Sequence, residues 1–161
     1  MEIILKKHIL IANGVNLDLL GIREPDIYGS DTLADIQKEI ERTAPFLSQA
    51  YGIGLKMTFF QSNSESDFLA ELSRQPWDGI LINPAAWTHT SLAIADRLAA
   101  INVPYVEVHL SNLHSREDFR SRSYTAFNSA GVVSGMGKGS YTSGLNGLLC
   151  KLSSIKKIKT D

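Results

Sequence analysis

The sequence of 161 residues has a single cysteine, no long hydrophobic run and almost no excess of charge of either sign. Cys150 alone cannot form an internal disulfide, which excludes a disulfide-stapled secreted fold and suits a reducing compartment. No apolar stretch approaches the roughly 20 residues that a membrane-spanning helix needs. A formal net charge of -1 gives no electrostatic footprint for nucleic acid or an anionic membrane. We therefore expect a cytoplasmic protein that binds neither nucleic acid nor membrane.

Several motifs of well-known chemistry are also missing. The chain has no Walker loop and no Gly-x-Ser-x-Gly elbow. Its four histidines and one cysteine show no metal-ligand spacing. The glycines at positions 135, 137 and 139 follow a predicted strand, but their spacing is not that of the dinucleotide fingerprint and no βαβ unit follows them.

What the chain does contain is an alternation of short apolar runs and amphipathic segments. This alternation predicts a parallel sheet with helices on both faces, and five strands at this length predict the flavodoxin-like order 2-1-3-4-5. The predicted strands lie at residues 8–12, 55–60, 79–82, 105–109 and 131–135, and the predicted helices at 33–51, 64–75, 90–101 and from 140 onward.

Length and composition predict one globular domain over residues 1–161. Within the first helical pattern, Pro45 lacks a backbone N–H and predicts a kink or break near Ala44. Residues 151–161 are basic and predict a solvated C-terminal tail.

Polar side chains follow the first and third predicted strands, which are neighbours in this strand order. Doubly wound sheets bind their ligands beyond the carboxyl ends of the strands at such a switch point. The segments that follow these two strands, residues 13–28 and 83–91, are the most densely polar of the segments that follow a strand. A ligand is therefore expected against Asn16, Asn83 and His89.

Residues 17–29 form a long loop between glycines that carries Arg23 and Tyr28. Loops of this length are usually functional or disordered, and the leucines and isoleucines here argue against permanent disorder. We expect an active-site loop that opens and closes.

Two further groups of charged residues lie near the same edge. Glu107 and His109 are two apart on a predicted strand and share a face, either as parts of a catalytic site or as a buried hydrogen-bond network. Arg116 and Arg120 share a face if 115–119 is a helical turn. With Arg23 they favour an anionic ligand, although a solvated face paired with neighbouring carboxylates is the alternative.

Together these motifs resemble type II 3-dehydroquinate dehydratases. The matching blocks are Asn13-Gly14-Val15-Asn16-Leu17, Gly21-x-Arg23-Glu24-Pro25-x-x-Tyr28-Gly29, Gln61-Ser62-Asn63-x-Glu65, Asn83-Pro84-Ala85-Ala86-x-Thr88-His89-Thr90-Ser91, Glu107-Val108-His109-Leu110-Ser111-Asn112, Arg116-Glu117-x-Phe119-Arg120 and Ser123-Tyr124. They follow the family's order over about residues 8 to 150. Val15 and Ala85 depart from the pattern, which commonly has proline and glycine there.

The resemblance implies dehydration of 3-dehydroquinate to 3-dehydroshikimate, by anti elimination through an enolate. The reaction belongs to the shikimate pathway of aromatic amino acid biosynthesis or to quinate catabolism. The resemblance also implies that no metal, Schiff base or other cofactor takes part, and that the chain assembles as a dodecamer of trimers. The alternative function is a non-catalytic flavodoxin-like module that binds a small polyhydroxy carboxylic acid.

The resemblance also implies the catalytic roles. Tyr28 matches the base, and because a free tyrosine has a pKa near 10, nearby positive charge from Arg23 is expected to lower it. Asn16 matches the residue that stabilises the enolate through a held water, and His109 matches the general acid, with Glu107 close enough to tune it.

The remaining matches are to substrate-binding residues. Asp96 matches a residue that reaches in from an adjacent subunit. Backbone N–H groups of Leu110 and Ser111 are expected to meet the substrate carboxylate, and side chains that hold the ring hydroxyls or carboxylate are expected at Asn83, His89, Arg116 and Arg120.

Overall fold

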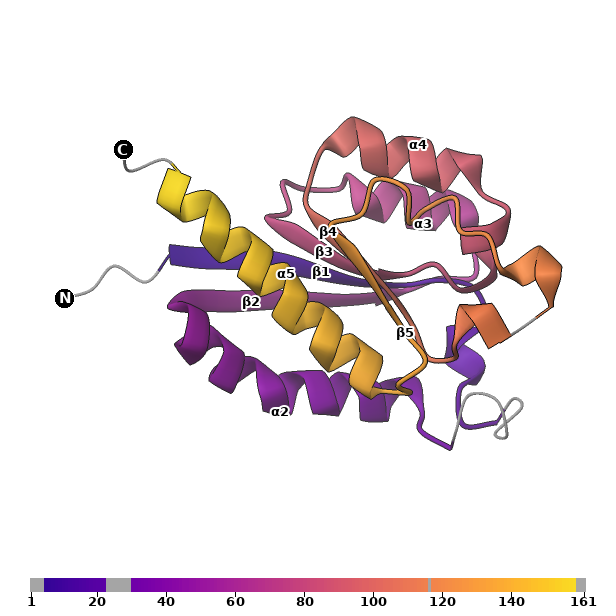
Figure 1. Cartoon of the computed structure of the whole chain (residues 1–161), viewed down its shortest axis with the longest axis horizontal. Coiled ribbons are helices and arrows are strands. Elements are labelled where there is room, and N and C mark those ends of the chain that lie inside the picture. The colour runs from indigo at the N-terminus through magenta and orange to yellow at the C-terminus, as the bar shows by residue number, and fades with distance from the viewer. Residues whose placement is uncertain (1–4, 23–29, 116, 159–161) are drawn as a thin grey trace.

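The computed structural model describes residues 5–22, 30–115 and 117–158 (Figure 1). Its centre is a wholly parallel sheet in which the strand order is β2-β1-β3-β4-β5. This order confirms the predicted flavodoxin-like sheet, and each predicted strand is present. The strands are β1 (Leu5–Asn13), β2 (Ile53–Gln61), β3 (Gly79–Asn83), β4 (Tyr105–His109) and β5 (Gly131–Ser134).

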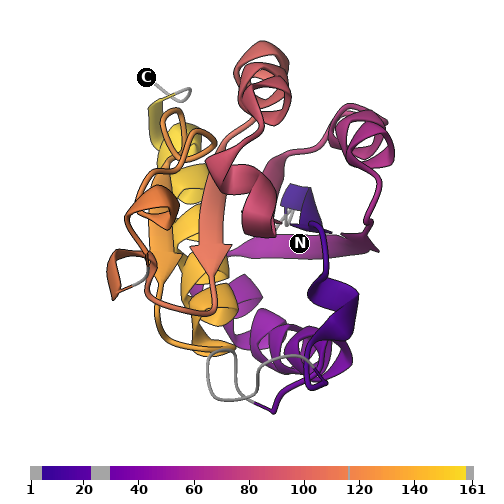
Figure 2. The same ribbon diagram turned by 90° about the vertical axis from the view of Figure 1, so that its right-hand side faces the viewer.

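Helices cover both faces of this sheet. On one face α2 (Leu33–Tyr51) packs beside α5 (Gly139–Ile158), and on the other α3 (Glu65–Leu72) packs beside α4 (Leu92–Ile101) (Figure 1). Figure 2 looks onto the carboxyl end of the strands, where short 3-10 helices follow β1, β3 and β4. These are η1 (Leu17–Leu19), η2 (Ala85–His89), η3 (Leu113–Ser115) and η4 (Asp118–Arg120).

Strand β1 shows why the central strands read as continuous apolar runs. Ile9 and Ile11 pack into the core beneath α2 and α5, whereas Leu10 and Ala12 pack into the core beneath α3 and α4. Successive side chains point to opposite faces of a sheet, and both faces are covered here. The four positions 9–12 must therefore all be apolar.

A kink or break was predicted in the first helix, and the break is wrong. Helix α2 begins at a capping box in which Thr32 caps the helix, and it continues through Pro45 to Tyr51. Pro45 is exposed, so its ring faces solvent while Ala44 beside it is buried in the core. The proline removes one backbone hydrogen bond, but the buried apolar face holds the helix together across it.

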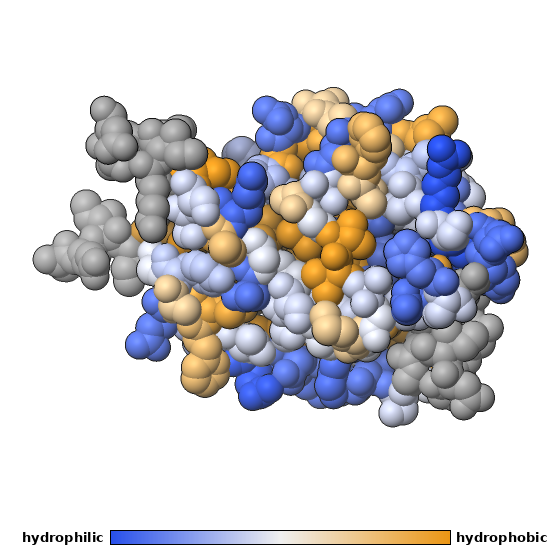
Figure 3. All heavy atoms as spheres, viewed as in Figure 1, coloured by the Kyte–Doolittle hydropathy of each residue, from blue (hydrophilic) through white to orange (hydrophobic). Residues whose placement is uncertain are grey.

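The predicted C-terminal tail is also corrected, because α5 continues to Ile158. Leu152 is buried in the core beneath this helix, although Lys151 beside it is exposed. Figure 3 shows the face formed by α5 and β5, where apolar areas interrupt a largely polar surface. Within the described ranges, no helix is both long and apolar enough to cross a membrane.

Candidate active site

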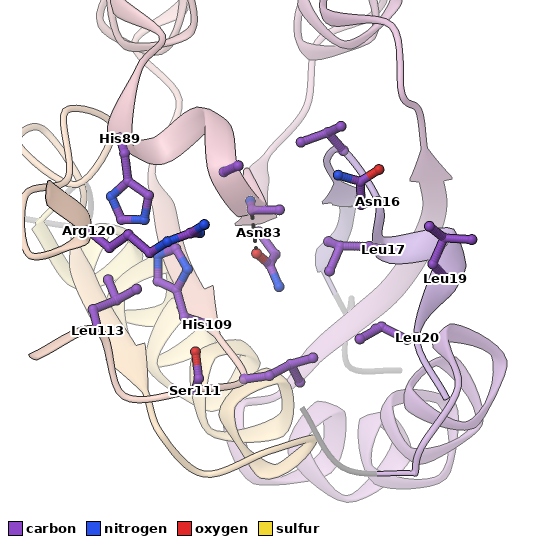
Figure 4. Close-up of a pocket in the computed structure, with 14 residues that line it drawn as sticks. Asn16, Leu17, Leu19, Leu20, Asn83, His89, His109, Ser111, Leu113 and Arg120 are labelled. Carbon is purple, nitrogen blue, oxygen red and sulfur yellow. Dashed lines mark hydrogen bonds between the residues drawn. The ribbon is translucent and has the colours of Figure 1, made fainter. Parts of the chain in front are cut away.

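A cavity of about 280 Å³ opens at the carboxyl edge of the sheet, in front of β1, β3 and β4 (Figure 4). The structure brings together Asn16, Asn83 and His89, the residues that the strand order predicted to meet a ligand. It adds His109 and Arg120 from later segments of the chain. The full lining is Val15, Asn16, Leu17, Leu19, Leu20, Asn83, Ala85, Ala86, His89, His109, Leu110, Ser111, Leu113 and Arg120.

The segments that follow β1 and β3 are hydrogen-bonded to each other at this edge of the sheet. The backbone N–H of Gly14 donates to the carbonyl oxygen of Asn83 at 2.8 Å. A Cβ atom at position 14 would lie 2.4 Å from the carbonyl oxygen of Pro84, so only glycine allows this approach. The two exits therefore form one continuous wall of the cavity.

A buried chain of hydrogen bonds lies behind that wall. The Tyr141 hydroxyl of α5 donates to Asn13 Oδ1 at 2.7 Å and accepts from Asn83 Nδ2 at 2.8 Å. Asn83 Oδ1 in turn accepts from the backbone N–H of Ala85 at 3.1 Å, where the backbone is left-handed with φ 54°. Burial raises the pKa of Tyr141, which keeps this hydroxyl neutral and able to donate.

Asn16 is placed by the exit of β2. It has a left-handed backbone with φ 64° and ψ 6°, and its N–H donates to Asn63 Oδ1 at 2.7 Å. Gln61 Nε2 also donates to that Asn63 oxygen at 3.2 Å and to the carbonyl oxygen of Gly14 at 3.3 Å. Amides from β2 therefore hold the turn that brings Asn16 to the cavity.

Glu107 and His109 lie on one face of β4, as their spacing predicted, and their side chains are in contact. His109 Nε2 lies 2.7 Å from Glu107 Oε1, and the Glu107 side chain is fully buried. A carboxylate only accepts, so Nε2 carries the hydrogen and Nδ1 is the ring nitrogen left for a ligand. Burial by itself raises the pKa of Glu107, but hydrogen bonding and charge from His109, with hydroxyls from Thr125 and Thr88, outweigh it and hold the pKa below its usual value.

Three hydroxyls that converge on this carboxylate were missed by the sequence reasoning. Thr88 and Ser123 donate to Glu107 Oε1, each at 2.8 Å, and Thr125 donates to Oε2 at 2.5 Å. Thr88 and Ser123 occurred in the family blocks without a role, and nothing in the sequence pattern singles out Thr125. Glu107 therefore belongs to a buried hydrogen-bond network, as the alternative interpretation proposed. It also contacts His109, which lines the cavity.

His89 contacts the same segment. Its Nδ1 lies 2.7 Å from the carbonyl oxygen of Arg122. Because a carbonyl oxygen only accepts, Nδ1 carries the hydrogen, and Nε2 is the nitrogen left for the cavity.

Arg120 lies on η4 and lines the cavity beside His109 (Figure 4). Its Nε lies 3.4 Å from Glu117 Oε2, so the predicted pairing with a neighbouring carboxylate is present on a residue that also lines the cavity. The condition for a shared face with Arg116 is not met. Glu117 has an extended backbone with ψ 145°, so 115–119 is not a helical turn.

The other predicted site residues fall into three groups. Leu110 and Ser111 line the cavity directly after β4. Asp96 of α4 lies in a separate hollow of about 250 Å³ with Arg122. The predicted base and its partner, with the first arginine of the 116/120 pair, lie outside the described residues: these are Tyr28, Arg23 and Arg116.

Known proteins resemble this chain along most of its length. A family model described as dehydroquinase class II matches residues 7–149. The chain is 46% identical over 147 residues to a 3-dehydroquinate dehydratase of Alkalilimnicola ehrlichii, which spans 89% of this chain and 93% of that protein. The crystal structure of a type II dehydroquinase from Butyrivibrio crossotus has a TM-score of 0.75 at 34% identity and covers 89% of this chain and 97% of its own. The crystal structure of a type II dehydroquinase from Propionibacterium acnes has a TM-score of 0.76 at 33% identity and covers 94% of this chain and 99% of its own.

Proposed function

Because this chain belongs to the class II dehydroquinase family, we propose that it dehydrates 3-dehydroquinate to 3-dehydroshikimate, in the shikimate pathway or in quinate catabolism. The observation that carries the proposal is the imidazole of His109 in the cavity wall, backed by the buried carboxylate of Glu107. An elimination needs a proton donor beside the leaving hydroxyl. A module that only bound a polyhydroxy acid would not need one.

The proposed reaction needs no metal or other cofactor. The Tyr28 phenolate, activated by Arg23, takes the proton α to the ketone, and the C–H electron pair forms the enolate. A water held by Asn16 stabilises the enolate oxygen. As the enolate collapses, the new C=C bond forms and the C–O bond of the leaving hydroxyl breaks. In this proposal His109 reacts as the imidazolium, with Nε2–H bonded to Glu107 and Nδ1–H facing the substrate. Nδ1 gives its proton to the leaving hydroxyl, which departs as water, and the ring becomes neutral.

The remaining cavity residues fit a small anion that carries several hydroxyls. The Arg120 guanidinium lines the cavity and suits a carboxylate. Asn83 and His89 supply amide and imidazole groups for ring hydroxyls. Backbone N–H groups of Leu110 and Ser111, and the side chain of Arg116, complete the proposed set.

We further propose a cytoplasmic dodecamer of trimers in which each chain is one catalytic domain. The hollow that holds Asp96 is lined by Leu92 and Phe127, whose side chains are 60% and 88% exposed. Exposed apolar groups around a carboxylate suit a contact with a second copy, in which Asp96 would reach the neighbouring cavity. Light scattering on the purified chain measures this mass directly.

The test is to mix the purified chain with 3-dehydroquinate and follow the ultraviolet absorbance of the conjugated enone product. The wild type should form the enone, and Tyr28→Phe should lower kcat by about two to four orders of magnitude, because the base is lost. Tyr51→Phe, at the C-terminal end of α2 and away from the cavity, is the matched control.

Each outcome of this experiment has a distinct meaning. A wild type that binds the substrate but forms no enone would establish the binding module instead. Normal turnover in Tyr28→Phe would keep the reaction and reject the base.

A further inference from the structure

Glu107 is an uncommon feature, since a charged residue lies at the middle of a central strand and is fully buried. The only position it contacts that also lines the cavity is His109, among the described residues. A buried carboxylate in such a place needs several donors to remain ionised. The hydrogen-bond donors around Glu107 therefore show how the carboxylate that holds the His109 imidazole is itself kept in place.

Four donors meet this carboxylate: the Nε2–H of His109 and the hydroxyls of Thr88, Ser123 and Thr125. Three of these donors lie on Oε1 and one lies on Oε2, and together they stabilise the ionised form of Glu107. Three of the four bonds come from groups that do not reach the cavity, and Thr88 and Thr125 are completely buried.

The hydroxyls are themselves held by the backbone around them. The Tyr105 hydroxyl donates to the carbonyl oxygen of Thr125 at 2.6 Å, and burial with the charge of Glu107 raises the pKa of Tyr105 to about 12, so it remains a donor. Ser123 Oγ accepts from the N–H of Ala126 at 2.9 Å. Thr88 Oγ1 also lies 2.7 Å from both Ser123 Oγ and Thr125 Oγ1, so the three hydroxyls form one hydrogen-bonded cluster against the carboxylate.

The same short segment supports both histidines of the cavity. Its Arg122 carbonyl accepts from His89 at 2.7 Å, and the N–H of Tyr124 donates to the carbonyl oxygen of Thr88 at 2.8 Å. Residues 122–125 thus link η2, which carries His89, to β4, which carries His109. A shift of this segment would change the orientation of both rings.

We propose that Thr88, Ser123 and Thr125 are positioning residues, which hold the Glu107 carboxylate and through it direct Nδ1 of His109 toward the leaving hydroxyl. The inference rests on the proposed dehydratase function. It assigns the three hydroxyls to the protonation of the leaving group and not to the removal of the α proton. The two steps can be measured separately, and this makes the assignment testable.

The experiment follows 3-dehydroquinate in D₂O by NMR, which records exchange of the α proton and formation of the product in one sample. Thr125→Val removes the hydroxyl at nearly constant shape. It should lower product formation about ten- to a hundredfold, the range expected from one lost hydrogen bond to a charged group. Exchange of the α proton should change less than about threefold, so the ratio of exchange to elimination should rise.

Three variants complete the design. Thr125→Ser restores the hydroxyl and should recover most of the product formation. Ser123→Ala, at a half-buried position, should change the ratio in the same direction and serves if Thr125→Val does not fold. Thr43→Val is the matched control, because its hydroxyl donates to the Glu39 carbonyl oxygen of α2 at 2.9 Å and lies outside the network.

A second readout does not depend on turnover. The ring ¹⁵N and N–H signals of His109, identified by their absence in His109→Ala, should report a hydrogen on Nε2 in the wild type. Thr125→Val should broaden or shift them, while Thr43→Val should not. If the wild type forms no enone but the ring signals respond, the proposed function fails and the positioning survives.

Two results would overturn the inference. One is equal loss of exchange and elimination in Thr125→Val, which would indicate a general structural defect. The other is an unchanged ratio with unchanged ring signals, which would mean that the hydroxyls do not position His109.

Discussion

The two walls of the cavity rest on different kinds of buried polar group. Behind Asn83 lies the neutral hydroxyl of Tyr141, which joins two amides. Behind His109 lies Glu107, a carboxylate. Both groups are completely buried and burial raises the pKa of each, yet only that of Tyr141 ends above its usual value.

The difference lies in the partners. Tyr141 has two amide partners, which suit a neutral group that both donates and accepts. Glu107 has an imidazole and three hydroxyls, all able to donate, which suit a charge. Asn83, which is proposed only to bind the substrate, is therefore held by a neutral group. His109, which is proposed to transfer a proton, is held by a charged group.

The largest effect should come from removing the charge while keeping the shape. Glu107→Gln should lower kcat about a hundredfold or more, the low end of a general acid's contribution, while KM changes little. Steady-state kinetics of the enone assay measures both. Glu71→Gln is the matched control, because Glu71 is also a buried carboxylate but lies on α3 and pairs with Arg74. A wild-type kcat in Glu107→Gln would remove the distinction between the two walls.

The neutral wall should respond in stability and in binding. Tyr141→Phe leaves Asn13 and Asn83 without their shared partner in the core, which should lower the free energy of unfolding by about 1–3 kcal/mol and raise KM more than it lowers kcat. Urea unfolding and kinetics measure these two effects. Tyr51→Phe, which loses an exposed bond to Asn146, should stay within about 0.5 kcal/mol of wild type. Equal stability of the two variants would mean that the buried bonds contribute nothing.

The smallest effect is a difference in how stability depends on pH. The pKa of Glu107 is lowered on folding from its usual 4.5, so ionised Glu107 stabilises the fold above that value. This contribution is lost as the pH falls through the lower pKa of the folded state. Urea unfolding between about pH 6 and pH 3 should therefore show a steeper fall in unfolding free energy for wild type than for Glu107→Gln. Parallel curves would indicate a carboxyl that is not ionised in the fold.

The edge of the sheet that carries the cavity could be predicted because local patterns encode it. Each apolar run marked a strand of the sheet, and the polar residues after two neighbouring strands marked where the chain leaves β1 and β3 at the same edge. The break at Pro45 was predicted wrongly because a missing N–H is a local signal, whereas the burial of Ala44 and the rest of that face is tertiary. The tail at 151–161 was misjudged for a similar reason, since its lysines hid the buried Leu152.

The sequence by itself determined the strand order, the place of the cavity and the shared face of Glu107 and His109, because each follows from the alternation of strands and helices and from the two-residue period of a strand. Only the tertiary structure decided what holds those groups. Thr125 donates to a carboxylate 18 positions away, and Tyr141 accepts from an amide 58 positions away. A hydroxyl has no periodicity that reveals its partner, so its role is set by which distant segment the fold brings within 3 Å of it.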